Sequence, residues 1–262
     1  MIKRALTIAG SDSGGGAGIQ ADIKTFSAFG VYGMSILTAV TAQNSMHVNG
    51  VFGISPAFVS LQFESVLTDI GIDGIKTGML FNAEIVQIVT QKCSENHIPF
   101  LIVDPVIRSK SGYSLLDHTG IALLKERLIP LATLVTPNIP EAEILSEMSI
   151  HTDEDIFIAE KKIYNLGCKA VLIKGGHRNN DATDILFDGV EFSKFTSQRI
   201  DTKNTHGTGC TYSAAILANL VKGNTLKNAI HISKLFVTEA IKHAFSLGKG
   251  NGPLNHFIQV EK

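Results

Sequence analysis

The amino-acid sequence predicts a single α/β domain, built on a mostly parallel, doubly wound central sheet with helices on both faces. Short runs rich in β-branched residues alternate along the chain with longer stretches whose apolar residues recur at helical spacing. The runs LIVD, which ends at Asp104, and AVLIK, which ends at Lys174, are apolar on both faces, as expected when helices cover both sides of a parallel sheet. No linker, repeat or low-complexity segment interrupts the sequence, so we expect residues 1–262 to form one domain.

The expected strands and helices alternate along most of the chain. The predicted parallel strands are Leu6–Ala9, Ile36–Gln43, Gly74–Gly78, Phe100–Val103, Thr133–Thr136 and Ala170–Lys174. The predicted helices between them lie near residues 17–29, 56–69, 82–96, 116–130 and 152–167. Such sheets bind ligands at the carboxyl ends of their strands, so polar residues that directly follow a strand are the functional candidates.

The last third of the chain departs from this alternation. The segments Thr183–Phe187 and Glu191–Phe195 are joined through Asp188-Gly189, which predicts a β-hairpin. After Gly209 the pattern is helical throughout, to about residue 247.

Composition argues against several classes of protein. Hydrophobic residues make up 44% of the 262 residues and charged residues only 18%, with a net charge of -1. A nucleic-acid-binding protein usually shows a basic excess, and this sequence has none. No apolar run reaches the ~20 residues of a membrane span, and the opening MIKRALTIAG does not fit a signal peptide. The three cysteines have no metal-ligand spacing and predict no disulfide framework, so we expect a cytoplasmic protein.

The first glycine-rich segment runs from Gly10 to Gly18 and leads from a strand into a helix. Glycines at such a junction let backbone N–H groups approach a ligand closely. The segment lacks the Lys-Ser/Thr of a Walker motif, and Ile19 stands where the dinucleotide fingerprint needs glycine. Taken alone, the segment fits a flexible turn as well as a ligand-binding loop.

A second glycine-rich segment, Gly207-Thr208-Gly209-Cys210, opens the long apolar helix that follows it. Successive N–H groups and the helix dipole point at one spot there, which suits a transferring phosphoryl group. Cys210 falls in the first helical turn, where the pKa of a thiol is lowered and a thiolate becomes accessible. A lone cysteine is more often a small packing residue, but the adjacent anion site favours a functional role.

A third set of polar residues follows different strands: Asp104, then Asn138 with Glu141, and Lys174. We expect all of them at the same edge of the sheet. Carboxylates and an amide together suit Mg²⁺, and a neighbouring lysine suits a phosphate. Asn138 and Glu141 fit the N-cap and capping box of a helix equally well. Asp104 also fits a turn before Pro105, and Lys174 fits a surface charge at a strand end.

Seven segments of the chain, taken together and in order, resemble the hydroxymethylpyrimidine/phosphomethylpyrimidine kinases of thiamin biosynthesis. They are AGSDSGGGAGIQADIKT, TAVTAQN, IKTGML, VDPV, TPNIPEAE, IKGGH and NTHGTGC. The similarity covers essentially the whole chain and implies the ribokinase-like fold, with ATP and Mg²⁺ as cofactors. It also implies two successive reactions, in which 4-amino-5-hydroxymethyl-2-methylpyrimidine is converted to its monophosphate and then to its diphosphate.

The resemblance implies roles for individual residues. The positions that match the family's anion hole and catalytic base are Gly207, Thr208, Gly209 and Cys210. The positions that match the nucleotide contacts are Lys174, Asn138 and Asp104, and those of the magnesium region are Asp104 and Glu141. The wider superfamily usually carries aspartate where this chain has Cys210.

The substrate pocket is matched by a further set of residues: Gln43, Asp22, Gly10, Met79 and Val106. The side-chain amide of Gln43 suits an aminopyrimidine, because it offers both a donor and an acceptor to a ring nitrogen and its amino group. One departure is Tyr113, where the family commonly carries an acidic residue.

Other functions stay open on the sequence alone. Pyridoxal kinases share the scaffold, but their cysteine-type members tend to lack glutamine at the position of Gln43 and often carry cysteine where this chain has Thr205. A non-catalytic vitamin-binding relative is disfavoured by the presence of Cys210, Lys174 and Asp104. A nicotinamide-dependent dehydrogenase is disfavoured by the failed fingerprint. The resemblance further implies a homodimer.

Overall fold

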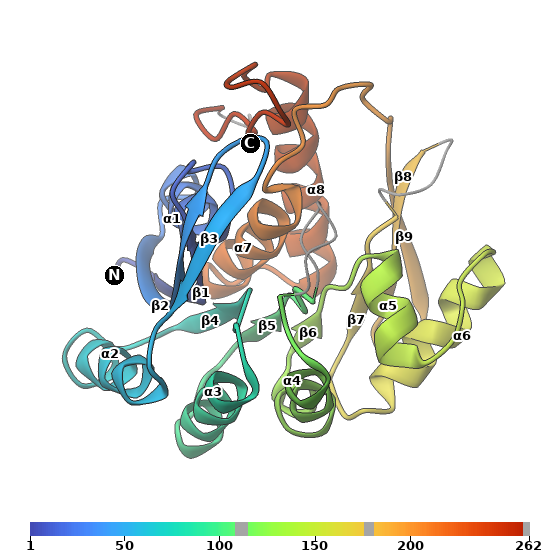
Figure 1. Cartoon of the computed structure of the whole chain (residues 1–262). Coiled ribbons are helices and arrows are strands. Elements are labelled where there is room, and N and C mark those ends of the chain that lie inside the picture. Colours follow the sequence, from blue (N-terminus) through green and yellow to red (C-terminus); the bar gives the residue numbers. More distant parts are fainter. Residues whose placement is uncertain (108–114, 176–180, 259–262) are drawn as a thin grey trace.

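A computed structural model describes residues 1–107, 115–175 and 181–258 of the chain. Its strands are β1 (Arg4–Asp12), β2 (Tyr32–Gln43), β3 (Val48–Gly53), β4 (Gly74–Thr77), β5 (Leu101–Val103), β6 (Leu134–Val135), β7 (Val171–Ile173), β8 (Ala182–Phe187) and β9 (Phe192–Ser197). They form one sheet in the order β3-β2-β1-β4-β5-β6-β7-β8-β9 (Figure 1). The neighbouring strands β2, β1, β4, β5, β6 and β7 run parallel to one another. Strands β3, β8 and β9 pair antiparallel with their neighbours.

Helices cover both faces of this sheet (Figure 1). On one face lie α1 (Gly18–Ala28), α7 (Thr208–Val221) and α8 (Leu226–Lys242). On the other lie α2 (Pro56–Asp69), α3 (Ala83–Glu95), α4 (His118–Leu123), α5 (Ile139–Ser146) and α6 (Asp153–Tyr164). This is the predicted α/β architecture, with a doubly wound and mostly parallel sheet.

The central strands are buried on both faces, as their unbroken apolar runs predicted. Successive residues of a strand point to opposite faces. Ile102 and Leu134 accordingly pack into the apolar cluster beneath α7 and α8, while Val103 and Val135 pack into the cluster on the opposite face. The apolar layers on the two faces hold the carboxyl ends of β1, β4, β5 and β7 at a common edge.

One strand was not predicted, and one helix was anticipated only through its capping pair, Asn138 and Glu141. Strand β3 lies at the edge of the sheet and contains Asn49 and Gly50, which weaken a strand pattern, but it pairs antiparallel with β2, with one register shift between Ala42 and Gln43. Helix α5 has only eight residues and carries Pro140 near its start, where proline is tolerated because that N–H has no partner in the helix.

Two predicted helices are shorter or broken in the structure. The stretch near 116–130 forms α4 and then continues as a π turn, Leu124–Leu128, and a 3-10 turn, Ile129–Leu131, because Pro130 cannot donate an α-helical hydrogen bond. The last helical region is two helices, separated at Gly223, whose φ of 95° ends α7. The predicted hairpin is confirmed as β8 and β9, with the Asp188 carboxylate accepting from two turn N–H groups.

In the part of the chain that the structure describes, no helix is long and apolar enough to cross a membrane. Tyr113, the departure noted in the sequence, lies outside the described residues.

Candidate active site

A cavity of about 250 Å³ lies at the carboxyl edge of the parallel strands, where the sequence placed the functional candidates. Most of the predicted site residues line it, although they come from positions between 10 and 210 in the chain. The predicted residues on its wall are Gly10, Gln43, Met79, Asp104, Val106, Asn138, Glu141, Lys174, Gly207, Thr208, Gly209 and Cys210.

The N-terminus of α7 faces this cavity. Gly207 precedes the helix with a φ of 82°, and a Cβ at this position would lie 1.8 Å from the carbonyl oxygen of Gly16. Only glycine fits there, and it offers no side chain to cap the helix. The first N–H groups of a helix have no partner within it, so the turn through Gly209 and Cys210 can bind an anion in the cavity.

The Cys210 thiol lies half-buried on the same wall, and the N–H of Gly18 donates to its sulfur. Burial raises the pKa of Cys210 to about 11, although the nearby ammonium group of Lys76 acts in the opposite direction. The carboxylate of Asp104 contributes to the rise. The lowered pKa expected from the helix N-terminus is therefore wrong for this structure, in which desolvation of the thiolate dominates.

Lys174, which is partly buried, and the buried Asp104 form an ion pair beside the helix N-terminus. The Lys174 Nζ lies 2.7 Å from Asp104 Oδ1, and a Cβ on Gly209 would lie 3.3 Å from the same Nζ. Burial alone would raise the pKa of Asp104, but the ammonium groups of Lys174 and Lys76 hold it below its ordinary value. The lysine is thus a fixed positive charge at the cavity wall rather than a surface charge at a strand end.

Asn138 and Glu141 form the capping box of α5. The Asn138 side chain accepts from the Glu141 N–H at 2.9 Å, and the Glu141 carboxylate accepts from the Asn138 N–H at 2.9 Å. Both residues also line the cavity, so the capping role does not exclude a ligand contact. Burial, together with the charge of Asp104, raises the pKa of Glu141 to about 7.

The carboxylates of Asp104 and Glu141 suit a divalent cation that is shared with phosphate oxygens. Within the described ranges, no three His, Cys, Asp or Glu side chains are arranged to hold a metal ion by themselves. Mg²⁺ commonly takes only one or two carboxylates and completes its shell with water and substrate phosphates. The raised pKa of Glu141 reflects the cost of two buried negative charges, which a divalent cation would offset.

Asp22 is not on the cavity wall, in contrast to the prediction that it binds substrate. It is fully buried in α1, accepts from the Thr7 hydroxyl at 2.6 Å and pairs with Lys76 Nζ at 2.9 Å. Burial alone would lower the pKa of Lys76, but the carboxylate of Asp22 holds the pKa of that lysine well above its ordinary value. The pair lies beneath the site and acts on Cys210 through its charges.

The first glycine-rich segment folds around a carboxylate of the protein itself. The N–H groups of Gly14, Gly16 and Ala17 donate to Asp12, at 2.8, 3.1 and 2.9 Å. His206 Nε2 lies 2.9 Å from the same carboxylate, which is 4% exposed. These N–H groups are therefore occupied, and the segment acts as a structured turn rather than as an anion cradle.

The remaining predicted pocket residues form a mainly apolar wall. A Cβ on Gly10 would lie 2.5 Å from Met79 Cε, so the small residue leaves room for the methionine side chain. Val106 lines the same cavity, and Gln43 lies at the end of β2, where it pairs with Val48 of β3 after a shift in register. Sequence reasoning did not single out Asp12, Lys76 or His206.

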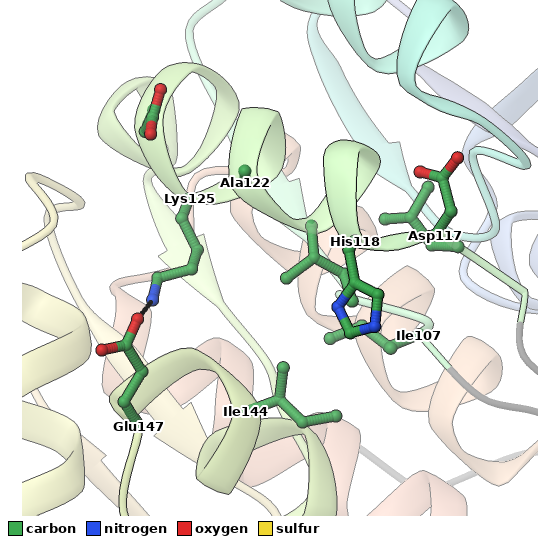
Figure 2. A pocket seen from close by; sticks show the side chains of 10 residues that line it. Ile107, Asp117, His118, Ala122, Lys125, Ile144 and Glu147 are labelled. Atoms are coloured by element: carbon green, nitrogen blue, oxygen red, sulfur yellow. Dashed lines mark hydrogen bonds and ion pairs between the residues drawn. The ribbon is translucent and has the colours of Figure 1, made fainter.

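A second hollow, of about 460 Å³, lies between α4 and α5 (Figure 2). Ile107 and Ile144 supply apolar wall, and an ion pair between Lys125 and Glu147 lies at one side (Figure 2). It contains none of the predicted site residues. The smaller cavity is the candidate active site, because it brings together an anion-binding helix end, a lysine, two carboxylates and a thiol.

Comparison with known proteins supports the resemblance that the motifs showed. A protein-family model described as phosphomethylpyrimidine kinase matches residues 12–255. The hydroxymethylpyrimidine/phosphomethylpyrimidine kinase of Bacillus subtilis is 48% identical over 258 residues, which are 98% of this chain and 95% of that protein. A thiamine biosynthesis bifunctional protein of Geobacter sulfurreducens is 51% identical over 257 residues, 98% of this chain and 52% of that protein, so this chain spans about half its length.

Among solved structures, the ADP complex of Bacillus subtilis pyridoxal kinase matches with a TM-score of 0.90 and 41% identity, over 98% of each chain. The family match covers nearly the whole chain, and the strand order, the helix layers and the cavity agree with the ribokinase-like fold that the motifs implied. The chain therefore belongs to the phosphomethylpyrimidine kinase family.

Proposed function

We propose that this chain is an ATP-dependent kinase that phosphorylates 4-amino-5-hydroxymethyl-2-methylpyrimidine to its monophosphate and then to its diphosphate. Family membership supports phosphoryl transfer and implies ATP as the co-substrate. The observation that carries the proposal is the arrangement of the cavity, in which Gln43 and the N-terminus of α7 line a single space. A ring bound at Gln43 can present its hydroxymethyl group to a phosphoryl group held at the helix.

Phosphoryl transfer depends mainly on positioning and on stabilising charge. In this proposal the N–H groups of the turn from Gly207 to Cys210 hold the transferring phosphoryl group. Lys174 neutralises phosphate charge, and Asn138 contacts the nucleotide from the start of α5. Cys210 lines the same cavity, and we assign it the role of general base, which accepts the proton of the substrate hydroxyl.

Asp104 and Glu141 are the residues that we propose for Mg²⁺. Both line the cavity, and both are buried beside Lys174. The ion would neutralise phosphate charge when it is bound with the nucleotide. Asp104 and Glu141 contribute the negative charge, and the capping box of α5 holds the Glu141 carboxylate in place.

Substrate choice is assigned to the cavity residues outside α7. Gln43 reads the amino group and the adjacent ring nitrogen, and Met79, Val106 and Gly10 bound the ring. Asp22 is left out of this contact set because the structure buries it beneath the cavity. Its pairing with Lys76 gives it a structural and electrostatic role instead.

Pyridoxal kinase activity is the second candidate, and the TM-score of 0.90 to a pyridoxal kinase favours it. Two observations favour the aminopyrimidine over pyridoxal. The amide of Gln43 lies on the cavity wall, and the chain is 48% identical to the Bacillus subtilis hydroxymethylpyrimidine/phosphomethylpyrimidine kinase. We therefore propose the aminopyrimidine as the main substrate.

We also propose that residues 1–262 act as one kinase domain, in a cytoplasmic homodimer. The single sheet, the small net charge and the family resemblance support this proposal. The mass measured by light scattering in solution, against 28.1 kDa for one chain, tests the dimer.

A product assay tests the proposed function. The protein is incubated with ATP and Mg²⁺ and either the aminopyrimidine, its monophosphate or pyridoxal, and the products are separated by chromatography. We expect the monophosphate and then the diphosphate to form from the aminopyrimidine, with a higher kcat/KM than for pyridoxal. A higher kcat/KM for pyridoxal would favour the second candidate, and no ATP consumption with either compound would favour a non-catalytic binding protein.

A further inference from the structure

Two neighbours hold the side-chain amide of Gln43, and together they determine which end of it is the acceptor. Its Nε2 position lies 3.3 Å from His206 Nε2, and its Oε1 position lies 3.4 Å from the hydroxyl oxygen of Thr41. The two ends of a glutamine amide have nearly the same shape, so their identities follow from what each neighbour can donate or accept.

Asp12 determines what His206 can offer. Its Oδ2 lies 2.9 Å from His206 Nε2, and an ionised carboxylate can only accept a hydrogen bond. Burial alone would raise the pKa of Asp12, but His206 and the backbone N–H groups of the glycine-rich turn hold it below its ordinary value. The hydrogen therefore belongs on Nε2, in the neutral ring as in the protonated one. A nitrogen that carries a hydrogen cannot accept another from Gln43.

Thr41 imposes the matching condition on the other end of the amide. Its hydroxyl donates to the carbonyl oxygen of Ser11 at 2.8 Å, the shorter of its two contacts. A hydroxyl has one hydrogen, so toward Gln43 it has only lone pairs to offer. The amide NH₂ therefore belongs beside Thr41 and the amide oxygen beside His206, where it shares the single Nε2 hydrogen with Asp12 as the longer of two acceptors. Turning the amide over removes the contact between two donors at His206 and gives the Thr41 oxygen a donor, without moving either neighbour.

We propose that Asp12 and His206 are positioning residues that orient the Gln43 amide and thereby favour an aminopyrimidine. In this orientation the amide keeps one lone pair on its oxygen and one hydrogen on its nitrogen for a substrate. An amino group and the adjacent ring nitrogen of an aminopyrimidine offer the complementary donor and acceptor. This inference rests on the proposed function, in which Gln43 reads that edge of the ring.

The surroundings of His206 prevent its ring from turning away. A Cβ on Gly16 would lie 2.5 Å from His206 Cδ2, so the ring lies directly against the glycine. The backbone N–H of His206 donates to the carbonyl oxygen of Gly252 at 3.1 Å. The C-terminal segment and the glycine-rich turn thus hold the imidazole between Asp12 and Gln43.

A matched pair of variants tests this role. Glutamine at position 206 can place an NH₂ donor near the position of Nε2, whereas methionine of similar length cannot donate. We expect His206→Met to lower kcat/KM for the aminopyrimidine about tenfold, the effect of one lost hydrogen bond in a partly buried site. The loss should be much smaller for an analogue whose amino group is replaced by hydrogen, and His206→Gln should restore most of the discrimination. His231→Met, at an exposed position of α8, serves as the control.

A second readout separates positioning from general damage. If His206 acts through Gln43, then His206→Met should have little further effect in a Gln43→Met background. Nitrogen-15 NMR of the unmodified protein should show hydrogen on Nε2 of His206. Three outcomes would each overturn this inference and leave the proposed function intact. They are an equal loss of kcat/KM for the aminopyrimidine and its analogue, an undiminished loss in the Gln43→Met background, and hydrogen only on Nδ1 of His206. An unmodified protein that does not phosphorylate the aminopyrimidine would overturn the proposed function, and this inference with it.

Discussion

Replacing Cys210 by alanine should damage the first phosphorylation far more than the second. In the first step the nucleophile is a neutral hydroxymethyl group, whose proton must leave as the bond to phosphorus forms. A positioned base typically contributes ~10²–10⁴-fold to such a step. In the second step the nucleophile is a phosphate monoester oxygen, which is mostly ionised at neutral pH because its second pKa is near ~6. We therefore expect a loss of about 10²-fold or more in the first step and a small loss in the second.

The pKa of Cys210 gives this prediction a second, pH-dependent form. With a pKa of about 11, only a fraction on the order of 10⁻⁴ of the thiol is ionised at pH 7. If the thiolate is the base, kcat/KM for the first step rises about tenfold per pH unit between pH 7 and 10. The second step needs no base and should not show this rise. In Cys210→Ala the rise should disappear from the first step as well.

Single-step kinetics, started separately from the aminopyrimidine and from its monophosphate, measure both effects. Cys93→Ala is the matched control, because Cys93 is a buried thiol on α3 that does not line the cavity. Equal losses in both steps of Cys210→Ala would mean that Cys210 acts through the geometry of the helix N-terminus. A first step that is independent of pH in the unmodified protein would rule out the thiolate as the base.

Three further changes test other parts of the site and of the core. Gln43→Met should lower turnover of the aminopyrimidine roughly tenfold or more, through loss of a paired hydrogen bond worth ~1–3 kcal/mol, and should affect pyridoxine less; equal losses in steady-state assays would contradict this. Glu141→Gln should raise the Mg²⁺ concentration needed for half-maximal activity and barely change Tm, whereas early melting with an unchanged Mg²⁺ requirement would leave Glu141 only its capping role. Glu160 in α6 is fully buried, and burial raises its pKa to about 9, although a backbone hydrogen bond from Ile173 acts in the opposite direction. Between the ordinary pKa of a glutamate and about 9, Glu160 is protonated in the folded protein and ionised in the unfolded chain. The free energy of unfolding therefore falls as pH rises through this range. As pH rises from 5 to 8, the free energy of unfolding of Glu160→Met, measured with urea, should increase relative to that of the unmodified protein by on the order of 3 kcal/mol. A difference between the two proteins that does not change with pH would refute a protonated Glu160.

The strands of the sheet centre were predictable because burial on both faces leaves unbroken apolar runs such as those ending at Asp104 and Lys174. The edge strand β3 was not, because an exposed strand with glycine has no such pattern. The sequence also predicted that Asp104, Asn138, Glu141 and Lys174 lie close together, because each follows a parallel strand and the ends of these strands meet at one edge. All four residues line the cavity.

The long-range partners of the buried carboxylates Asp22 and Asp12 could not be read from the sequence in the same way. Asp22 contacts Lys76 across 54 positions of the chain, and His206 contacts Asp12 across 194. No local pattern specifies such a partner, because it depends on how β1, β4 and the start of α7 are brought together. A lysine within the apolar strand β4 was the one available signal, since a lysine is seldom fully buried without a carboxylate.

The charges of the cavity indicate which form of the nucleotide the site suits. Among the described residues of its wall, Lys174 is the one lysine or arginine, and Asp104 already neutralises it. Beneath the wall, Lys76 is neutralised by Asp22, and Glu141, with a pKa of about 7, adds negative charge as pH rises. A polyphosphate alone would bring several more negative charges beside Glu141, and in the described part of the wall the N–H groups of α7 offer only partial positive charge to balance them. A nucleotide that carries its own divalent cation brings the missing positive charge with it, and this favours the magnesium complex over the free nucleotide as the proposed co-substrate.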